Sequence, residues 1–281
     1  MAPAQNEQIE QIEQIEQKAI FITGGAGGMG LATGQLFAEH GWFVGLFDID
    51  EATLAQSAVA FDPDNSMYRR LDVTDESDFT GAMDAFAAAT GGRLDVMFNN
   101  AGIAPGAWFD EMPMTTIRQI IDINVFGVII GTRLALPLLR STAGSINVST
   151  SSSVATYGHA LRAVYAASKY AVKGLTEALS LEFERFGVRA ADVLPGCIDT
   201  PMLRNALAAG AGRPFEESMF DGMQQEGAYR LMPVSAIADA VWNAYHDQHT
   251  IHWYVPEEVG EIDRMDIDAA RALTKDFLFN R

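Results

Sequence analysis

Five glycines lie within seven residues near the N-terminus, in the run Gly24-Gly25-Ala26-Gly27-Gly28-Met29-Gly30. The run joins an apolar segment, residues 19–23, to a segment that begins with Leu31-Ala32, and these are typical of a buried strand and a helix. Between such elements a glycine-rich turn lets the backbone approach a pyrophosphate, whose charge then lies at the helix N-terminus. The sequence therefore predicts a nucleotide-binding turn in which Gly24, Gly28, Met29 and Gly30 contact the ligand.

Two other interpretations of the glycine run compete with this one. No Lys-Ser or Lys-Thr pair follows the run, so it is not the P-loop that grips a triphosphate with Mg²⁺. A flexible glycine loop without a ligand would explain the glycines, but not the strand and the helix that flank them.

Strand and helix patterns alternate along the rest of the chain. Strands are expected at residues 19–23, 42–47, 67–71, 94–98, 144–148, 189–194 and 251–255, and helices at 75–89, 114–139 with an interruption at Pro137, 163–186 and 234–246. This alternation predicts an α/β fold with a doubly wound parallel sheet of about seven strands, helices on both faces and a single domain, residues 18–255. We expect residues 1–17 to be a disordered leader, residues 201–230 a flap over the substrate, and residues 256–281 an acidic tail.

Charge and cysteine content limit the possible functions. The formal net charge of −18 opposes binding to nucleic acid. The single cysteine, Cys197, excludes an internal disulfide framework and fits a reducing compartment. No apolar run approaches the length of a membrane span and the N-terminus lacks a signal pattern, so we expect a cytoplasmic protein that does not bind membranes. The five histidines have no metal-ligand spacing, and no metal is expected.

Asp48 follows the second expected strand, at about the spacing of the acid that holds the adenosine ribose hydroxyls of a dinucleotide. A carboxylate there accepts from both hydroxyls and repels a 2′-phosphate. No Arg or Lys lies in the glycine run or directly after Asp48. We therefore predict NAD rather than NADP. Asp50 is interpreted as the cap of the next helix.

Other small or polar residues also follow expected strands, where ligands of open α/β sheets bind. Asp72 and Val73 follow the third strand, and Asn99-Asn100-Ala101-Gly102 ends the fourth. Asp72 could accept from an adenine amino group or could help to cap the following helix. We predict that Asp72, Val73, Asn99, Ala101 and Gly102 contact the cofactor.

Tyr165 and Lys169 are four residues apart in an expected helix, so both side chains lie on one face, one turn apart. A lysine beside a phenol favours the phenolate and is expected to lower the pKa of Tyr165, which suits proton transfer near neutral pH. The pair alone is also compatible with an ordinary surface tyrosine and a solvated lysine.

The order and spacing of the glycine run, Asp48, Asp72-Val73, Asn99-Asn100-Ala101-Gly102 and Tyr165-x-x-x-Lys169 resemble the short-chain dehydrogenase/reductase family. The resemblance covers residues 18–255 and implies a Rossmann-type fold in the compact, single-domain form. It also implies catalytic roles for Asn124 and Ser152, with Ser151 and Ser153 as alternatives to Ser152. Pro195, Ile198 and Thr200 match the family segment that meets the nicotinamide. Residues 256–281 depart from the family pattern.

The expected reaction interconverts an apolar, aromatic or cyclic secondary alcohol and its ketone. Tyr165 would take the hydroxyl proton, and Ser152 would orient the substrate oxygen. By resemblance, Lys169 would hold the nicotinamide ribose and Asn124 a water. Residues expected to face the substrate are Trp108, Phe109, Tyr157, His159, Leu161, Met202, Phe220 and Met223.

A homodimer or homotetramer is expected from the resemblance. Two alternatives remain open from sequence: an NADP-dependent 3-oxoacyl reductase, against which Asp48 argues, and a dinucleotide-sensing protein without turnover. An incomplete set of Ser, Tyr and Lys would favour the second alternative, but the set is complete.

Overall fold

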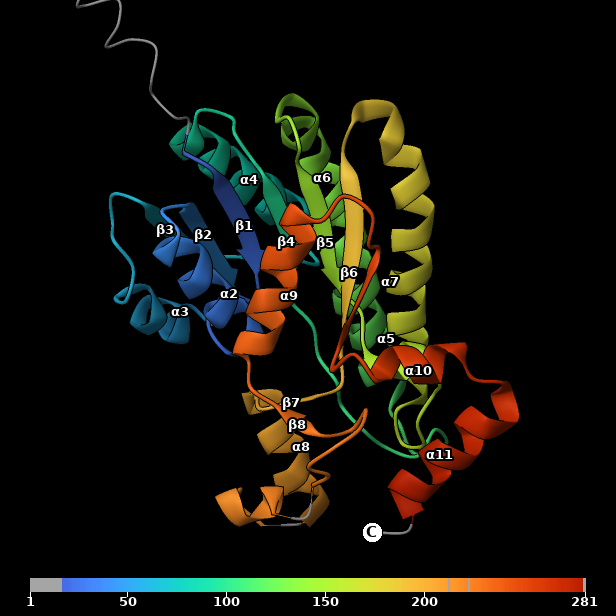
Figure 1. The fold of residues 1–281 in the computed structure, drawn as a ribbon. Coiled ribbons are helices and arrows are strands. Elements are labelled where there is room, and N and C mark those ends of the chain that lie inside the picture. The colour runs from blue at the N-terminus through green and yellow to red at the C-terminus, as the bar shows by residue number, and fades with distance from the viewer. Residues whose placement is uncertain (1–16, 212, 222, 280–281) are drawn as a thin grey trace, which may run out of the picture.

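Seven parallel strands form the central sheet, in the order β3-β2-β1-β4-β5-β6-β9. The computed structural model describes residues 17–211, 213–221 and 223–279 (Figure 1). The strands of this sheet are β1 Ala19–Thr23, β2 Phe43–Asp48, β3 Ser66–Arg70, β4 Val96–Asn99, β5 Ile146–Thr150, β6 Arg189–Pro195 and β9 His252–Val255. The predicted fold class and the strand number are therefore confirmed, with strand ends displaced by one or two residues.

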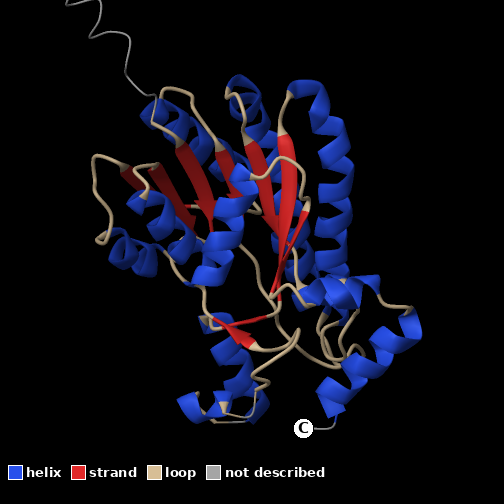
Figure 2. Ribbon diagram, in the orientation of Figure 1, coloured by secondary structure: helices blue, strands red, loops and turns tan. Residues whose placement is uncertain are grey.

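Helices cover both faces of the sheet (Figure 2). The helices are α2 Gly28–Glu39, α3 Glu51–Ala58, α4 Glu76–Thr90, α5 Met114–Ile121, α6 Gly127–Ser141, α7 Ala163–Glu182, α8 Pro201–Ala211, α9 Ser235–His246, α10 Val259–Arg264 and α11 Ile267–Phe279. Side chains of successive strand residues point to opposite faces. Ile20 and Ile22 accordingly pack with α2 and α9, whereas Ala19 and Phe21 pack with α4 and α6.

Short elements complete the chain beyond the carboxyl ends of the strands. Cys197–Ile198 (β7) and Leu231–Met232 (β8) form a two-stranded parallel ladder. Figure 1 shows this ladder with α8, α10 and α11 gathered at the end of the sheet to which the strand arrows point. Single-turn helices occur at Ser153–Ala155 (η2), Phe183–Phe186 (η3) and Glu217–Phe220 (η4).

Carboxylates begin two of the helices, as their sequence positions suggested. Asp50 accepts a hydrogen bond from Thr53 N (3.0 Å) at the start of α3. Asp75 accepts from Ser77 N and Asp78 N at the start of α4. These bonds satisfy backbone N–H groups that have no partner inside the helix.

The helix expected at residues 114–139 is continuous through Pro137 and ends at Ser141. Pro137 lies on the exposed side, where water can satisfy the carbonyl that its missing N–H leaves unbonded. The irregularity occurs instead at Asp122–Phe126 (η1), a π-helical turn in which Gly127 N donates to Asp122 O. The prediction of an interruption at Pro137 was therefore wrong.

This helix, Met114–Ser141, is long and apolar enough to cross a membrane, by length and composition alone. The expectation that no such run exists was therefore wrong. Its inner side packs on the sheet and on α4 through Ala135 and Leu139. Such packing is typical of a core helix of a globular domain.

Residues near both ends of the described chain contact the rest of the fold. Residues 1–16 of the predicted leader lie outside the described residues. Gln17, its last residue, donates from Nε2 to Gly41 O (3.1 Å) and to Asn65 Oδ1 (2.8 Å). At the other end, the expected acidic tail contains α10 and α11, and Ile262 and Ala270 pack with Tyr229 in a small apolar cluster.

Replacement of Gly30 by Ala tests the close approach of α2 to the end of β1. A Cβ at Gly30 would lie 2.2 Å from Gly24 O, so Gly30→Ala is expected to lower the free energy of unfolding by about 1–3 kcal/mol or more. Gly27→Ala is the matched control, because its φ of −168° suits any residue and nothing lies within 4 Å of a Cβ there. Urea denaturation followed by circular dichroism measures both. An equal loss of unfolding free energy in Gly30→Ala and Gly27→Ala would contradict the close packing at Gly30.

Candidate active site

Two neighbouring cavities open at the carboxyl ends of the strands. The Tyr165 cavity is lined by Met29, Asn100, Gly102, Ala104, Thr150, Ser151, Ser152, Ser153, Val154, His159, Arg162, Tyr165, Lys169, Pro195, Gly196, Cys197, Ile198, Thr200, Met202, Leu203, Ala206 and Tyr229. The Asp48 cavity is lined by Gly24, Asp48, Ile49, Leu71, Asp72, Val73, Thr74, Ala101, Gly102, Ile103, Thr115, Arg118, Gln119, Asp122 and Ile123. Gly102 belongs to both, so one elongated ligand could occupy the two.

The glycine-rich turn connects the two cavities. Gly24 lines the Asp48 cavity, and Met29 lines the Tyr165 cavity. Gly28 has a φ of +54°, a conformation that favours glycine, and its Cα faces Thr200. The turn therefore presents backbone between an adenosine-sized site and a reactive site, as a dinucleotide requires.

Side chains of β1 and β4 fix the position of this turn. Thr23 Oγ1 accepts hydrogen bonds from the backbone N–H groups of Asn100 (2.9 Å) and Ala101 (3.0 Å). Asn100 Nδ2 in turn donates to Thr23 O (3.1 Å) and Gly24 O (3.2 Å), and Asn100 Oδ1 accepts from Thr150 Oγ1 (3.2 Å). The ends of β1, β4 and β5 are therefore held together.

The side chain of Asn99 points away from both cavities. It is 2% exposed, and Nδ2 donates to Thr132 Oγ1 (3.2 Å) and Asn147 Oδ1 (3.1 Å) in the interior. The neighbouring Asn100, which we did not predict as a site residue, lines the Tyr165 cavity instead. Successive side chains of a strand alternate between faces, so the two asparagines cannot share a direction.

Asp48, Asp72 and Val73 lie together in the Asp48 cavity. The Asp48 carboxylate accepts from Ala26 N (3.0 Å) and from Asp50 N (3.1 Å), which fixes its orientation. Asp72 accepts from the hydroxyl (2.7 Å) and N–H (3.0 Å) of Thr74. Both carboxylates keep further acceptor capacity, since each oxygen has two lone pairs.

The structure brings Tyr165, Ser152 and Lys169 together. The Ser152 hydroxyl lies close enough to the Tyr165 phenol to lower its pKa. Lys169 Nζ donates to Thr150 O (2.7 Å) and lies 5.7 Å from the centre of the Tyr165 ring. The neighbouring serine hydroxyl, that of Ser151, is engaged elsewhere, because it donates to Lys169 O (2.9 Å). The geometry therefore favours Ser152 as the serine that serves Tyr165.

Burial sets the pKa of Tyr165 in the direction opposite to our expectation. Burial raises the pKa of the phenol, and the Ser152 hydroxyl and the charge of Arg162 offset this only in part. Lys169 is held at Thr150 O, where it does not hydrogen-bond the phenol. Burial also lowers the pKa of Lys169, to about 8, which leaves the ammonium charged at neutral pH.

Asn124 lies in the π-helical turn and is completely buried. Its Oδ1 accepts from Ile103 N (2.9 Å), and its Nδ2 donates to Ile103 O (2.9 Å) and Ser168 Oγ (3.1 Å). The side chain thus joins the segment after β4 to α7. A Cβ at Gly102 would lie 3.2 Å from Asn124 Oδ1 and 3.5 Å from Lys169 Nζ, which places all three groups at one point.

A buried carboxylate on β6 lies near Lys169. Asp192 is completely buried, and its Oδ1 is bonded to His252 Nδ1 (2.7 Å). Its Oδ2 has no hydrogen-bond partner among the described residues. Burial raises the pKa of Asp192 to about 6, and its negative charge opposes the loss of the Lys169 proton. Burial lowers the pKa of His252, but the hydrogen bond to Asp192 and the charges of Asp192 and Glu177 together outweigh this and raise it overall.

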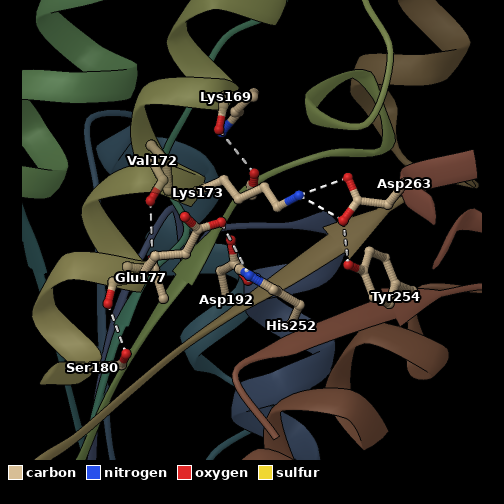
Figure 3. Close-up of polar contacts among 11 residues, drawn as sticks. Lys169, Val172, Lys173, Glu177, Ser180, Asp192, His252, Tyr254 and Asp263 are labelled. Carbon is tan, nitrogen blue, oxygen red and sulfur yellow. Dashed lines mark hydrogen bonds and ion pairs between the residues drawn. The ribbon is translucent and has the colours of Figure 1, made fainter. Parts of the chain in front are cut away.

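One turn after Lys169, helix α7 is bonded to the C-terminal segment through Lys173 (Figure 3). Lys173 Nζ bonds both oxygens of Asp263, at 2.7 and 2.6 Å. The Tyr254 hydroxyl donates to Asp263 Oδ2 (2.6 Å). α10 therefore supports the helix that carries Tyr165 and Lys169, a contact that the sequence did not suggest.

Pro195, Ile198 and Thr200 line the Tyr165 cavity, but only two of the residues expected to face the substrate do so, His159 and Met202. Trp108 and Phe109 are 51% and 67% exposed. Tyr157, Leu161, Phe220 and Met223 are also outside its lining. Residues that sequence reasoning missed include Arg162, Leu203, Ala206 and Tyr229. The one available signal was that Arg162 directly precedes the helix expected to carry Tyr165.

Comparison with known proteins gives concordant results. The family model for short chain dehydrogenases matches residues 18–210. Momilactone A synthase of Oryza sativa subsp. japonica is 33% identical over 232 residues, which are 82% of this chain and 84% of that protein. Cyclopentanol dehydrogenase of Comamonas sp. (strain NCIMB 9872) is 36% identical over 195 residues, covering 68% and 77% of the two chains. The crystal structure of levodione reductase matches with a TM-score of 0.78 at 27% identity, covering 88% and 98%.

Replacement of Asp192 tests its effect on Lys169. Asp192→Asn removes the negative charge near the ammonium, so the pKa of Lys169 is expected to fall below its value of about 8. The chain has four lysines, so ¹³C NMR of lysine labelled at Cε can follow this titration. Asp263→Asn is the control, because this carboxylate faces Lys173 and should leave the Lys169 titration unchanged. An unchanged Lys169 pKa in Asp192→Asn would show that the Asp192 charge does not act on Lys169.

Proposed function

The chain belongs to the short-chain dehydrogenase family and is an oxidoreductase of secondary alcohols and ketones, and we propose that its substrates are cyclic and largely apolar and that its cofactor is NAD. The observation that carries the proposal is the meeting of Tyr165, Ser152 and Lys169 in one cavity beside the glycine-rich turn. A complete set of this kind also argues against a sensing protein without turnover.

The walls of the Tyr165 cavity support an apolar substrate. Met29, Val154, Ile198, Met202 and Leu203 contribute apolar side chains. Burying apolar surface against such walls gains about 25 cal/mol per Å². The similarity to cyclopentanol dehydrogenase points to a ring as the apolar body.

The Asp48 cavity supports NAD. The oriented Asp48 carboxylate can accept from ribose hydroxyls and would repel a 2′-phosphate. The two arginines of β3 do not offset this charge freely, because Arg69 and Arg70 both pair with Asp78. Gly24 and Gly30 let the turn pack closely against Asn100, and no atom lies within 4 Å of the position that a Cβ would take at Gly27. The turn can therefore present its backbone to a pyrophosphate.

In the proposed mechanism, Tyr165 exchanges a proton with the substrate oxygen. Ile198 and Thr200 would hold the nicotinamide ring, which would supply the hydride donor or acceptor. The raised pKa keeps the phenol protonated at neutral pH, so Tyr165 can donate a proton to a ketone oxygen there. Alcohol oxidation needs the phenolate and therefore gains from alkaline conditions.

Ser152 and Lys169 assist this proton transfer in different ways. The Ser152 hydroxyl can hydrogen-bond both Tyr165 and the substrate oxygen, which stabilises negative charge that develops there. At neutral pH, where Lys169 is charged, its ammonium is anchored at Thr150 O and stabilises the negative charge that develops on the phenol oxygen when Tyr165 gives its proton to a ketone. Asn124 positions the segment around Ile103 and is proposed to affect the reaction through that segment.

Replacement of Tyr165 tests the proton-transfer role. Tyr165→Phe removes only the hydroxyl and is expected to reduce kcat for a cyclic alcohol by at least about 10²–10⁴-fold, the contribution of a positioned acid or base. Binding of NAD, measured by isothermal titration calorimetry, should change little. Tyr170→Phe, which alters an exposed tyrosine of the same helix, is the control. Turnover by Tyr165→Phe at the control's rate would refute the mechanism.

Replacement of Asp48 tests the cofactor preference. The unaltered enzyme is expected to have a kcat/KM for NAD at least about 10-fold above that for NADP, because a carboxylate opposes a 2′-phosphate. Asp48→Asn should reduce the ratio of kcat/KM for NAD to kcat/KM for NADP. Asp50→Asn removes a neighbouring charge and should leave this ratio unchanged. Reduced-nicotinamide absorbance with a panel of cyclic alcohols measures all three. A preference for NADP in the unaltered enzyme would overturn the role of Asp48.

A further inference from the structure

Arg162 is held at the wall of the Tyr165 cavity. It precedes α7 directly, and its Nη1 donates to Ala104 O. The preceding residue, Leu161, has a φ of +64°, and its carbonyl accepts from Ala107 N (3.1 Å). A non-glycine residue in this region costs about 1–2 kcal/mol, so the surrounding structure enforces the position of Arg162.

The charges of this cavity are unbalanced. No Asp or Glu occurs among the described residues that line it, although the chain has a net charge of −18. Its two permanent cations are Lys169 and Arg162. Lys169 has the Asp192 charge near it, whereas no carboxylate of the described residues lies within ion-pair distance of Arg162.

The remaining basic group of the cavity does not supply a second charge. Burial, together with the charge of Arg162, lowers the pKa of His159 to about 4, so its ring is neutral at pH 7. His159 Nε2 lies 3.3 Å from the Tyr229 hydroxyl, on the cavity wall. Arg162 is thus the cation that remains available to a ligand, with four guanidinium N–H groups besides the one that bonds Ala104.

Arg162 and Tyr165 face the same cavity. Both residues line it, and the charge of Arg162 acts to lower the pKa of the Tyr165 phenol, so the two side chains lie close together. A molecule whose carbinol oxygen meets Tyr165 can therefore present a second polar group to Arg162.

We propose that Arg162 binds a carboxylate of the substrate, so that the enzyme acts on ring-containing hydroxy acids. The inference rests on the proposed function, because it takes Tyr165 as the group that meets the carbinol. The planar guanidinium suits a carboxylate, which it can bind through two parallel hydrogen bonds. The apolar walls then hold the ring between the two polar ends.

A binding experiment tests the arginine without turnover. Cyclohexanecarboxylate and the neutral cyclohexanecarboxamide are titrated into the unaltered enzyme with NAD present, and into Arg162→Gln. The carboxylate is expected to bind at least about 10-fold more tightly than the amide, and Arg162→Gln should remove the difference. Gln can still donate to Ala104 O, and Arg133→Gln, at an exposed position of α6, controls for the loss of one positive charge. Equal binding of the two probes to the unaltered enzyme would overturn the inference.

A kinetic experiment separates this inference from the proposed function. With 4-hydroxycyclohexanecarboxylate, Arg162→Gln is expected to raise KM at least about 10-fold, while KM for 4-methylcyclohexanol and for NAD changes less than about 3-fold. If Arg162→Gln raises KM equally for both alcohols, Arg162 has a structural role. If it raises KM for NAD, Arg162 binds the cofactor. Either result overturns the inference. Failure of the enzyme to oxidise any alcohol, with selective carboxylate binding intact, would refute the proposed function and not the anion site.

Discussion

Hydrogen bonds between Thr23 and Asn100 hold the site together, because they fix the ends of three strands at one edge of the sheet. Asn100 reaches the carbonyls of Thr23 and Gly24 and the hydroxyl of Thr150. The loops after β1, β4 and β5 therefore start from fixed points. The glycine-rich turn follows β1, the segment around Ile103 follows β4, and Ser152 follows β5. The sheet therefore positions the polar groups that must lie within a few ångströms of one another for the reaction.

Burial of the site shifts the pKa values of Tyr165 and Lys169. It raises the pKa of Tyr165 and lowers that of Lys169, so it favours the neutral form of each. The buried Asp192 works in the other direction for Lys169, and its partner His252 belongs to β9. Together with the Lys173–Asp263 pair, this contact links the catalytic helix to the C-terminal part of the chain. Through Asp263, α10 therefore supports the helix that carries Tyr165 and Lys169.

Much of this arrangement could be predicted from sequence, because strand ends, glycine turns and helix spacing are local properties. They were enough for the parallel sheet and for the neighbourhoods of Asp48 and Tyr165. Properties that depend on three-dimensional packing were missed. Asn99 and Asn100 are adjacent, and only the pleat decides which one faces the ligand. The pKa of Tyr165 depends on burial, and Trp108 and Phe109 proved to be exposed. Arg162 gave little signal until the cavity around it was known.

In the proposed reaction the carbinol carbon gives a hydride directly to the nicotinamide, while Tyr165 takes the proton of the hydroxyl group. The most direct measurement uses cyclohexanol deuterated at the carbinol carbon, with NAD in ordinary water, and NMR of the reduced cofactor. Direct transfer predicts that one deuterium per turnover is found at C4 of the nicotinamide. Reduced cofactor that carries only protium at C4, or ketone formed without reduction of NAD, would contradict the account.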